Sequence, residues 1–181
     1  MQELKGNALN EFLLKKFGKT WESVIEDQFN IEDIDIASIE KFKHLAKDRL
    51  PFIQNENDVE VILEKLNLSE AKKIKRAAIL LFGKNVQKHF LQARVKIGFF
   101  TSGTDLINAD IVEGNLFQQL ERTLEILQAK YLLSPITYEG IHRREKLEIP
   151  FDALREAIIN ALIHRVYSTN SSIQIKITRT L

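Results

Sequence analysis

The clearest alternation of apolar and polar positions lies in the last thirty residues of the chain. After Pro150, apolar residues recur at spacings of three and four, at Leu154, Ala157, Ile158, Ala161 and Leu162. This spacing predicts a helix over residues 151–165 with one buried face. A polar break follows, and then isoleucine alternates with polar residues over 172–178. A period of two predicts a strand with one buried face.

The rest of the chain predicts helices first and strands later. Helical spacing of apolar residues, or a compact apolar run rich in alanine, is found over residues 9–17, 37–49, 58–67, 75–82 and 115–133. Alternation predicts a strand over 93–100 and a short extended piece over 110–113. The stretch 136–150, around Glu139 and Gly140, predicts two extended runs or an irregular hairpin.

Together these elements predict an α+β fold. Short alternating runs interspersed with long amphipathic helices favour a small mixed or mainly antiparallel sheet, with the helices 115–133 and 151–165 on one face. The N-terminal part is expected to be helical. We therefore expect a helical N-terminal portion over residues 1–70 and an α+β portion over residues 71–181.

Composition narrows the classes of function. With 181 residues, 44% of them hydrophobic, the chain can bury a substantial core. It has 26 basic and 25 acidic residues, so no overall field recruits nucleic acid or a membrane surface. The absence of cysteine excludes disulfides, thiolate metal sites and cysteine nucleophiles. No apolar run has the length of a signal peptide core or a membrane span, so we expect a cytoplasmic protein without a membrane partner.

One polar stripe stands out on the last predicted helix. Glu156, Asn160 and His164 recur every four residues, and each such step advances about 40° beyond a full turn. A carboxylate one turn before a carboxamide can polarise water while the amide oxygen helps to hold a hydrated Mg²⁺ ion, which suits nucleotide phosphates. The same spacing also arises on the solvent face of ordinary amphipathic helices, so the residues alone leave both interpretations open.

Two charged clusters are weaker candidates. His142, Arg143 and Arg144 form the densest basic cluster, which suits a phosphate or DNA contact but equally a solvated turn. The acidic residues around Asp33 and Asp35 could hold a cation. They also suit the start of a helix, where negative charge complements the helix dipole.

Several segments in combination resemble a known family. The segments are KRAAILLFGKNVQKHF, ARVKIGFF, IVEGNLFQQLERTLEIL, IHRRE and ALREAIINALIHR with the isoleucine-rich strand behind it. They resemble bacterial and archaeal transcriptional regulators related to the C-terminal part of RecG-like proteins. Members usually carry an N-terminal Schlafen AlbA-type DNA-binding domain, a region like this one, the rest of an ATP-binding domain and often a winged helix. The resemblance implies that this chain is the central part, with DNA bound by a domain outside it.

The segment ALREAIINALIHR is similar to a helix motif of the ATPases that include gyrase and the histidine kinases. The similarity implies that Glu156 is a general base, Asn160 a Mg²⁺ ligand, and His164 and Arg165 further nucleotide-binding residues. Val166 stands where the family commonly has aspartate. The residues 71–181 would then end in the first part of an ATPase-like fold.

The family's glycine-rich boxes do not follow this helix, because the seven glycines end at Gly140. We therefore expect no bound cofactor and no ATP hydrolysis by this chain, while the full-length protein would use Mg²⁺ and ATP. Three functions follow: a regulatory or interaction domain of a DNA-associated regulator, an incomplete ATP-binding domain, or an oligomerisation domain. We expect a homo-oligomer, with the strand over 172–178 offering a sheet edge.

Overall fold

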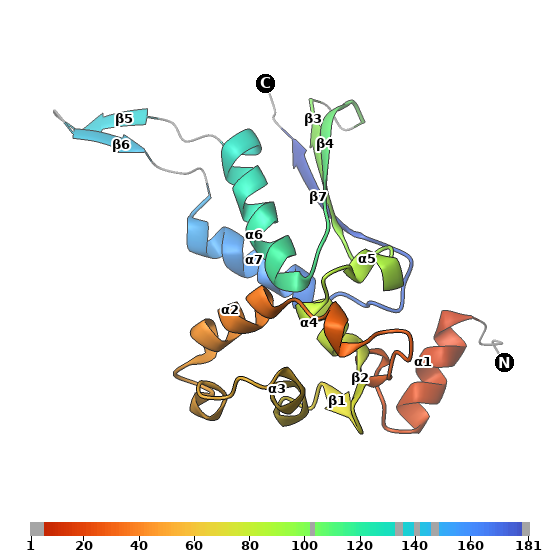
Figure 1. The fold of residues 1–181 in the computed structure, drawn as a ribbon. Coiled ribbons are helices and arrows are strands. Elements are labelled where there is room, and N and C mark those ends of the chain that lie inside the picture. The colour runs from red at the N-terminus through yellow and green to blue at the C-terminus, as the bar shows by residue number, and fades with distance from the viewer. Residues whose placement is uncertain (1–5, 102–103, 133–135, 140–141, 146–148, 179–181) are drawn as a thin grey trace. The chain divides into compact units, whose positions relative to one another are not determined.

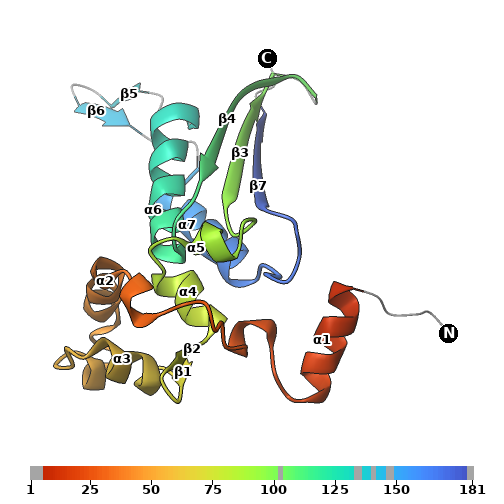
Figure 2. The same cartoon turned by 45° about the vertical axis from the view of Figure 1, so that its right-hand side comes forward.

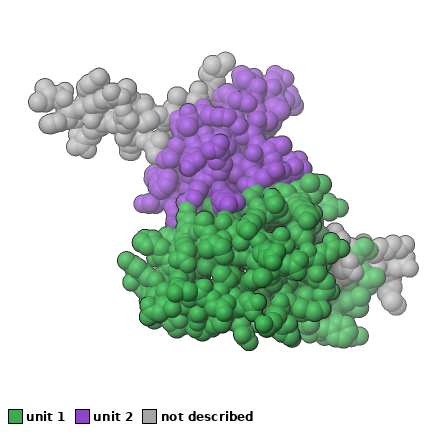
Figure 3. All heavy atoms as spheres, viewed as in Figure 1, with its two compact units in different colours: residues 1–93, 114–117, 166–171 green, residues 94–113, 118–165, 172–181 purple. Residues whose placement is uncertain are grey.

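The computed structural model describes residues 6–101, 104–132, 136–139, 142–145 and 149–178 (Figure 1). Helices and small sheets make it an α+β protein, as the sequence predicts. The chain forms two compact units (Figure 3). Unit 1 comprises residues 1–93, 114–117 and 166–171, and unit 2 comprises residues 94–113, 118–165 and 172–181.

Unit 1 is mainly helical. Its α-helices are α1 (Asn7–Lys16), α2 (Ile36–Ala46), α3 (Val59–Lys65), α4 (Arg76–Phe82) and α5 (Val86–His89). Its 3₁₀ turns are η1 (Trp21–Ser23), η2 (Ile31–Asp33) and η3 (Pro51–Ile53). A small antiparallel hairpin is formed by β1 (Ser69–Glu70) and β2 (Lys73–Ile74).

Local chemistry sets the ends of these helices. The Asp35 carboxylate accepts a hydrogen bond of 3.2 Å from the backbone N–H two residues on, which caps the first turn of α2. Asp58 does the same for α3, across 2.9 Å. Helix α4 ends at Phe82 and is followed by Gly83, where a Cβ atom would lie only 2.6 Å from the carbonyl oxygen of Ile79. The glycine therefore permits the close turn out of the helix.

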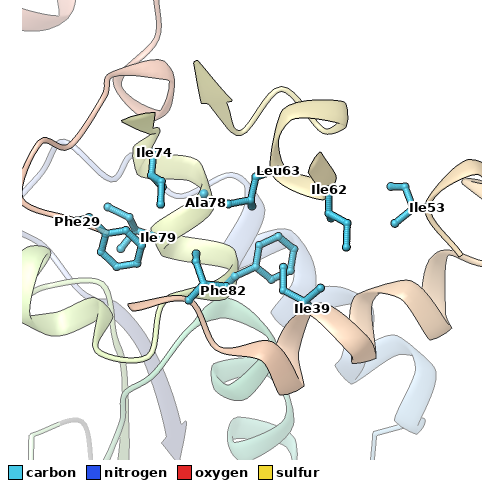
Figure 4. Packing of buried hydrophobic residues seen from close by; sticks show 10 residues of the cluster. Phe29, Ile39, Ile53, Ile62, Leu63, Ile74, Ala78, Ile79 and Phe82 are labelled. Carbon is cyan, nitrogen blue, oxygen red and sulfur yellow. The ribbon is translucent and has the colours of Figure 1, made fainter. Parts of the chain in front are cut away.

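The core of unit 1 is built around α4. Ala78, Ile79 and Phe82 are completely buried. They pack in one cluster with residues of α2, α3, β2 and the preceding loop (Figure 4), namely Phe29, Ile39, Ile62, Leu63 and Ile74. The first boundary between the two compact units falls after residue 93. The reason is that the apolar run of α4 finds its packing partners in the N-terminal helices.

An aromatic cluster holds segment 166–171 within unit 1. The Trp21 ring lies 4.9 Å from the Phe90 ring and 6.3 Å from the Tyr167 ring, measured between centroids. The Arg76 guanidinium lies 4.8 Å from the centroid of the tryptophan ring. Trp21 therefore anchors its loop rather than presenting a free ring face.

Segment 114–117 is held in unit 1 by buried polar contacts. The Asn115 side chain is fully buried, and its amide donates a 2.8 Å hydrogen bond to the Ser38 hydroxyl. The Gln87 side chain accepts from the Gly114 N–H at 2.9 Å and donates to the Gly114 carbonyl at 3.1 Å. These contacts satisfy polar groups that burial would otherwise penalise.

Unit 2 contains most of the β-structure. Its strands are β3 (Val95–Phe100), β4 (Leu106–Val112), β5 (Ile136–Glu139), β6 (His142–Glu145) and β7 (Ile173–Thr178). Its helices are α6 (Leu116–Ile126), whose first residues belong to unit 1, the π-helical turn η4 (Leu127–Tyr131) and α7 (Phe151–Ile163).

The main sheet has the strand order β4-β3-β7 (Figure 2). Strand β3 is antiparallel to β4 and parallel to β7, with Ile97 opposite Asp110 on one side and Ile175 on the other. The sheet is therefore mixed, which confirms the expected class. Strand β7 lies at the edge of this three-stranded sheet.

The helices of unit 2 pack on one face of this sheet. Alternate residues of β3 point to the same side. The Phe99 ring on that side lies 5.7 Å from the Tyr131 ring of η4. Residues of β3, η4, α7 and β7 also line one apolar groove of about 180 Å³, among them Val95, Leu127, Ile158 and Ile173. The predicted packing of both helices on one sheet face is confirmed.

Within the described part of the chain, no helix has both the length and the apolar composition that crossing a membrane requires.

Candidate functional site

Helix α7 carries the polar stripe that the sequence singles out. It begins after Pro150, whose carbonyl accepts the first helical hydrogen bond, 3.0 Å from the N–H of Leu154. Pro150 has no backbone N–H group of its own that would need a partner at the start of the helix. The helix ends at Ile163, and the backbone N–H of His164 still bonds to the Asn160 carbonyl at 2.9 Å. The expected span of 151–165 is thus confirmed to within two residues.

The apolar side of α7 is directed into unit 2. Ile158 and Leu162 are 5% and 3% exposed. Together with Leu154, Ala157 and Ala161 they line the apolar groove beside β7. All five are the residues from which the helix is predicted. This packing fixes which side of α7 remains available to a ligand or partner.

The polar stripe lies on the other side of the helix. Glu156, Asn160 and His164 are all exposed, and Arg165 is half-buried. Because the first three are spaced by four, they form one line along the outer surface of α7. A carboxylate and an amide so placed can reach water, a cation or a partner's side chains. The structure therefore brings the stripe together but leaves it open to solvent.

An exposed apolar residue accompanies this stripe. Ile163 follows Glu156 by seven residues, two helical turns on, and is 64% exposed. Sequence reasoning missed it because the residue is adjacent to the buried Leu162 and was not assigned to a face. Its spacing of seven residues from Glu156 would have placed it on the same side of the helix. Ile163 therefore adds one exposed aliphatic side chain to the polar side of α7.

The basic cluster lies in the β5–β6 hairpin. Arg143 is opposite Tyr138 and Arg144 is opposite Thr137 in an antiparallel pair, which confirms the predicted hairpin. The side chains of both arginines lie outside what the structure describes. A phosphate or DNA contact by these two residues stays a prediction.

The acidic residues near position 35 act as helix caps. Asp33 accepts a 3.1 Å hydrogen bond from the Asn30 backbone at the start of η2. Asp35 accepts from the Ser38 hydroxyl at 2.6 Å as well as from the backbone of α2. The described residues contain no group of three or more histidine and carboxylate side chains arranged to hold a metal ion.

A charged cluster that the sequence does not reveal lies in unit 2. The Asp110 carboxylate of β4 accepts a 2.6 Å hydrogen bond from the Lys130 ammonium and one of 2.5 Å from the Tyr131 hydroxyl. These two donors hold the pKa of Asp110 below its usual value. Burial, followed by the bond to the carboxylate, raises the pKa of Tyr131 to about 12. A carboxylate stabilised in this way is a weak base, so the cluster is structural in character.

Comparison with known proteins supports the fold. No family model matches the chain. The chain is similar to the isoleucine–tRNA ligase of Methanocaldococcus jannaschii, with 24% identity over 157 residues that cover 75% of this chain and 15% of the ligase. It is also similar to the structure of the DIP2311 protein from Corynebacterium diphtheriae, with 22% identity and a TM-score of 0.61.

The alignment with the DIP2311 protein covers 87% of this chain and 31% of that one. The chain therefore spans less than a third of the length of either protein. Identities this low carry no activity across to this chain, and the second similarity shows the fold alone.

Proposed function

We propose that this chain is a regulatory or interaction domain of a cytoplasmic, DNA-associated transcriptional regulator, and that the exposed side of α7 is its contact surface. The proposal rests on the resemblance of its segments to such regulators and on one observation above all. Helix α7 buries its apolar side in unit 2 and exposes Glu156, Asn160, Ile163 and His164 on the outer side. A solvent-exposed carboxylate and amide beside an exposed isoleucine suit a protein interface better than a closed catalytic site.

The partner that best matches this surface is a second copy of the chain. Two α7 helices packed antiparallel about a two-fold axis at Asn160 would place Glu156 of each copy opposite His164 of the other, because both lie four residues from the axis. An isologous contact requires such self-complementarity. The exposed Ile163 would add apolar area at the same contact.

Light scattering and sedimentation over a range of concentrations test this proposal. We expect the wild-type chain to dimerise and Ile163→Asp to remain monomeric at the same concentrations. Glu156→Lys should weaken the dimer because it removes the carboxylate that would face His164 of the second copy. The matched control is Ile36→Asp, which changes a 51% exposed isoleucine at the start of α2.

Dimerisation that survives Ile163→Asp, or a wild-type chain that stays monomeric at millimolar concentration, would contradict the proposal. Under the same proposal, DNA is bound by a domain outside this chain. The net charge of +1 predicts no submicromolar affinity for duplex DNA at physiological salt. Fluorescence anisotropy with a labelled duplex measures that directly.

A second candidate function is an ATP-binding domain of the gyrase and histidine-kinase type that further sequence would complete. It is favoured by the position of Glu156 and Asn160, one turn apart on the open side of α7. Calorimetric titration with Mg-ATP separates the two functions. We expect binding no tighter than about 1 mM, worth about 4 kcal/mol. Micromolar binding that Asn160→Ala abolishes would favour the ATP-binding function instead.

A further inference from the structure

Unit 1 contains an open pocket of about 570 Å³ that is separate from α7 and from its proposed role. Three segments surround it: the residues around the start of η2, helix α3, and the β1–β2 hairpin. Its volume lies in the range of roughly 300–1,000 Å³ that is usual for ligand sites.

The floor of the pocket is apolar and belongs to the core of unit 1. Phe29, Leu63 and Ile74 line it and are 4%, 0% and 3% exposed. Figure 4 shows that these side chains come from different segments and belong to one packed group. A floor fixed by core packing keeps its shape when a ligand arrives, which lowers the entropic cost of binding.

The rim of the pocket is acidic. Glu32, Glu60 and Glu64 line it and are all exposed. The ammonium of Lys72, at the tip of the hairpin, lies 3.2 Å from the Glu60 carboxylate. Within the described part of the chain, the carboxylates of Glu32 and Glu64 form no ion pair. The lining residues thus carry three negative charges against one positive charge, and the Lys84 ammonium lies nearby, 2.7 Å from the backbone carbonyl oxygen of Glu32.

We propose that this pocket binds a basic, extended peptide segment of a partner protein through one lysine or arginine side chain. The aliphatic stem of that side chain would lie on the half-buried lining residues Ile31 and Val61, and its cationic group would reach the carboxylates of Glu32 and Glu64. Long basic side chains commonly bury their stems on apolar surface and keep the charge at its edge. Lys72 already shows an ammonium group bound to one carboxylate of the same rim.

The exposure of the rim favours a peptide over a free amine. Small ligands are usually enclosed over roughly 70–90% of their surface. The rim carboxylates here are all exposed, so they cannot enclose a small polyamine in that way. A peptide adds contacts from its backbone and its neighbouring side chains outside the pocket. The pocket then has to hold only one cationic side chain of the peptide as an anchor.

The test uses a fluorescein-labelled ten-residue peptide of alternating lysine and valine, with a matched peptide in which glutamine replaces lysine. By anisotropy we expect the lysine peptide to bind with a Kd on the order of 100 µM at low salt. The glutamine peptide should bind at least about tenfold more weakly, and raising the salt concentration should weaken the lysine peptide. Spermidine should not displace the lysine peptide at equal charge concentration. Displacement by spermidine would assign the pocket to small amines and overturn the proposal.

Single-residue variants locate the binding. Glu64→Gln and Glu32→Gln should each weaken the lysine peptide about threefold, as for a partly exposed ion pair. Glu70→Gln is the matched control, because Glu70 is exposed on β1 and is not among the residues that line the pocket. It removes the same charge and should leave binding unchanged. An equal loss in Glu64→Gln and Glu70→Gln would show non-specific attraction and overturn the proposal.

A gain of affinity provides a test that misfolding cannot imitate. Lys72 has a φ angle of +63°, which asparagine tolerates well. Lys72→Asn should therefore keep the hairpin, release Glu60 from its ion pair and tighten the lysine peptide about threefold. Unchanged or weaker binding would contradict the proposed role of the rim. Repeating the titration in the Ile163→Asp background separates this site from dimerisation through α7, because the pocket should bind equally well there.

Discussion

The Tyr131 hydroxyl donates a 2.5 Å hydrogen bond to the Asp110 carboxylate, joining the end of the long helix of unit 2 to the edge strand β4. Tyr131 lies in the π-helical turn η4, where the helical repeat widens. Its ring is 4% exposed and packs beside Phe99. The widened turn thus directs one side chain to both the apolar face and the Asp110 carboxylate, so this contact is expected to contribute to the stability of unit 2.

Tyr131→Phe should destabilise unit 2 by about 1–3 kcal/mol, because it removes a hydrogen bond to a charged acceptor without changing the ring. Urea unfolding measures the difference. Lys130→Met is the comparison, since Lys130 also bonds to Asp110 but its side chain is 48% exposed. It should cost less than about 1 kcal/mol. Equal losses of stability in both variants would show that the tyrosine hydrogen bond contributes no more than the lysine one.

Stability should fall in acid partly through Asp110. The folded-state pKa of Asp110 is lowered from the ordinary 3.8, first by the bond from Lys130 and then by that from Tyr131. Its contribution is therefore fully present above the unfolded-state pKa and is lost as pH falls through the lower folded-state pKa. The stability difference between wild type and Asp110→Asn should stay constant above about pH 5. It should shrink once the pH falls below the ordinary carboxyl pKa of 3.8. A difference that is independent of pH would contradict this role.

At alkaline pH, Tyr131 should make the stability of the protein fall as pH rises. Its pKa is raised from the ordinary 10.0 to about 12, chiefly by burial. Its contribution is therefore fully present below the unfolded-state pKa and is lost as pH rises through the folded-state pKa. Wild type should lose stability relative to Tyr131→Phe between these two values, measured by urea unfolding. Phenolate absorbance should show a late-titrating tyrosine in wild type that Tyr131→Phe lacks.

Asn115→Ala should destabilise unit 1 by about 2–3 kcal/mol, since it removes a buried group that meets several partners. The Asn115 amide lies 2.8 Å from the Ser38 hydroxyl, 3.4 Å from the Gly83 carbonyl and 3.5 Å from Asp35. Asn108→Ala is the matched control, because Asn108 is exposed on β4. It should cost less than about 0.5 kcal/mol. Thermal and urea unfolding compare the two, and similar losses would refute the buried network.

The two sides of α7 should respond differently to truncation. Glu156→Ala, on the exposed side, should change the free energy of unfolding by less than about 0.5 kcal/mol. Ile158→Ala, at a position 5% exposed, should cost about 2–4 kcal/mol because it leaves a cavity under the sheet. Unfolding is measured at low protein concentration, where dimerisation does not contribute. A large loss in Glu156→Ala would mean that the polar side is part of the fold.

The local pattern of the sequence was enough to place several elements and their buried sides. The alternation of β3 and β7 and the spacing in α7 each repeat with the period of the structure they form, while α4 was predicted from a compact apolar run rich in alanine. Such periods record which side of an element meets the core. The same periodicity placed Glu156, Asn160 and His164 in one line, and the structure shows that line to be exposed.

Contacts between distant segments were decided only by the tertiary structure. Strand β3 pairs in parallel with β7, and Asp110 accepts a hydrogen bond from Tyr131. Both contacts join segments that are separated along the sequence. The unit boundary after residue 93 has the same origin, since α4 packs with helices that precede it. The sequence by itself determined the type of several elements and, in β3 and α7, buried positions such as Val95, Ile97, Ile158 and Leu162. Which elements bury one another depends on shape and hydrogen bonding between distant segments, and no local period encodes that.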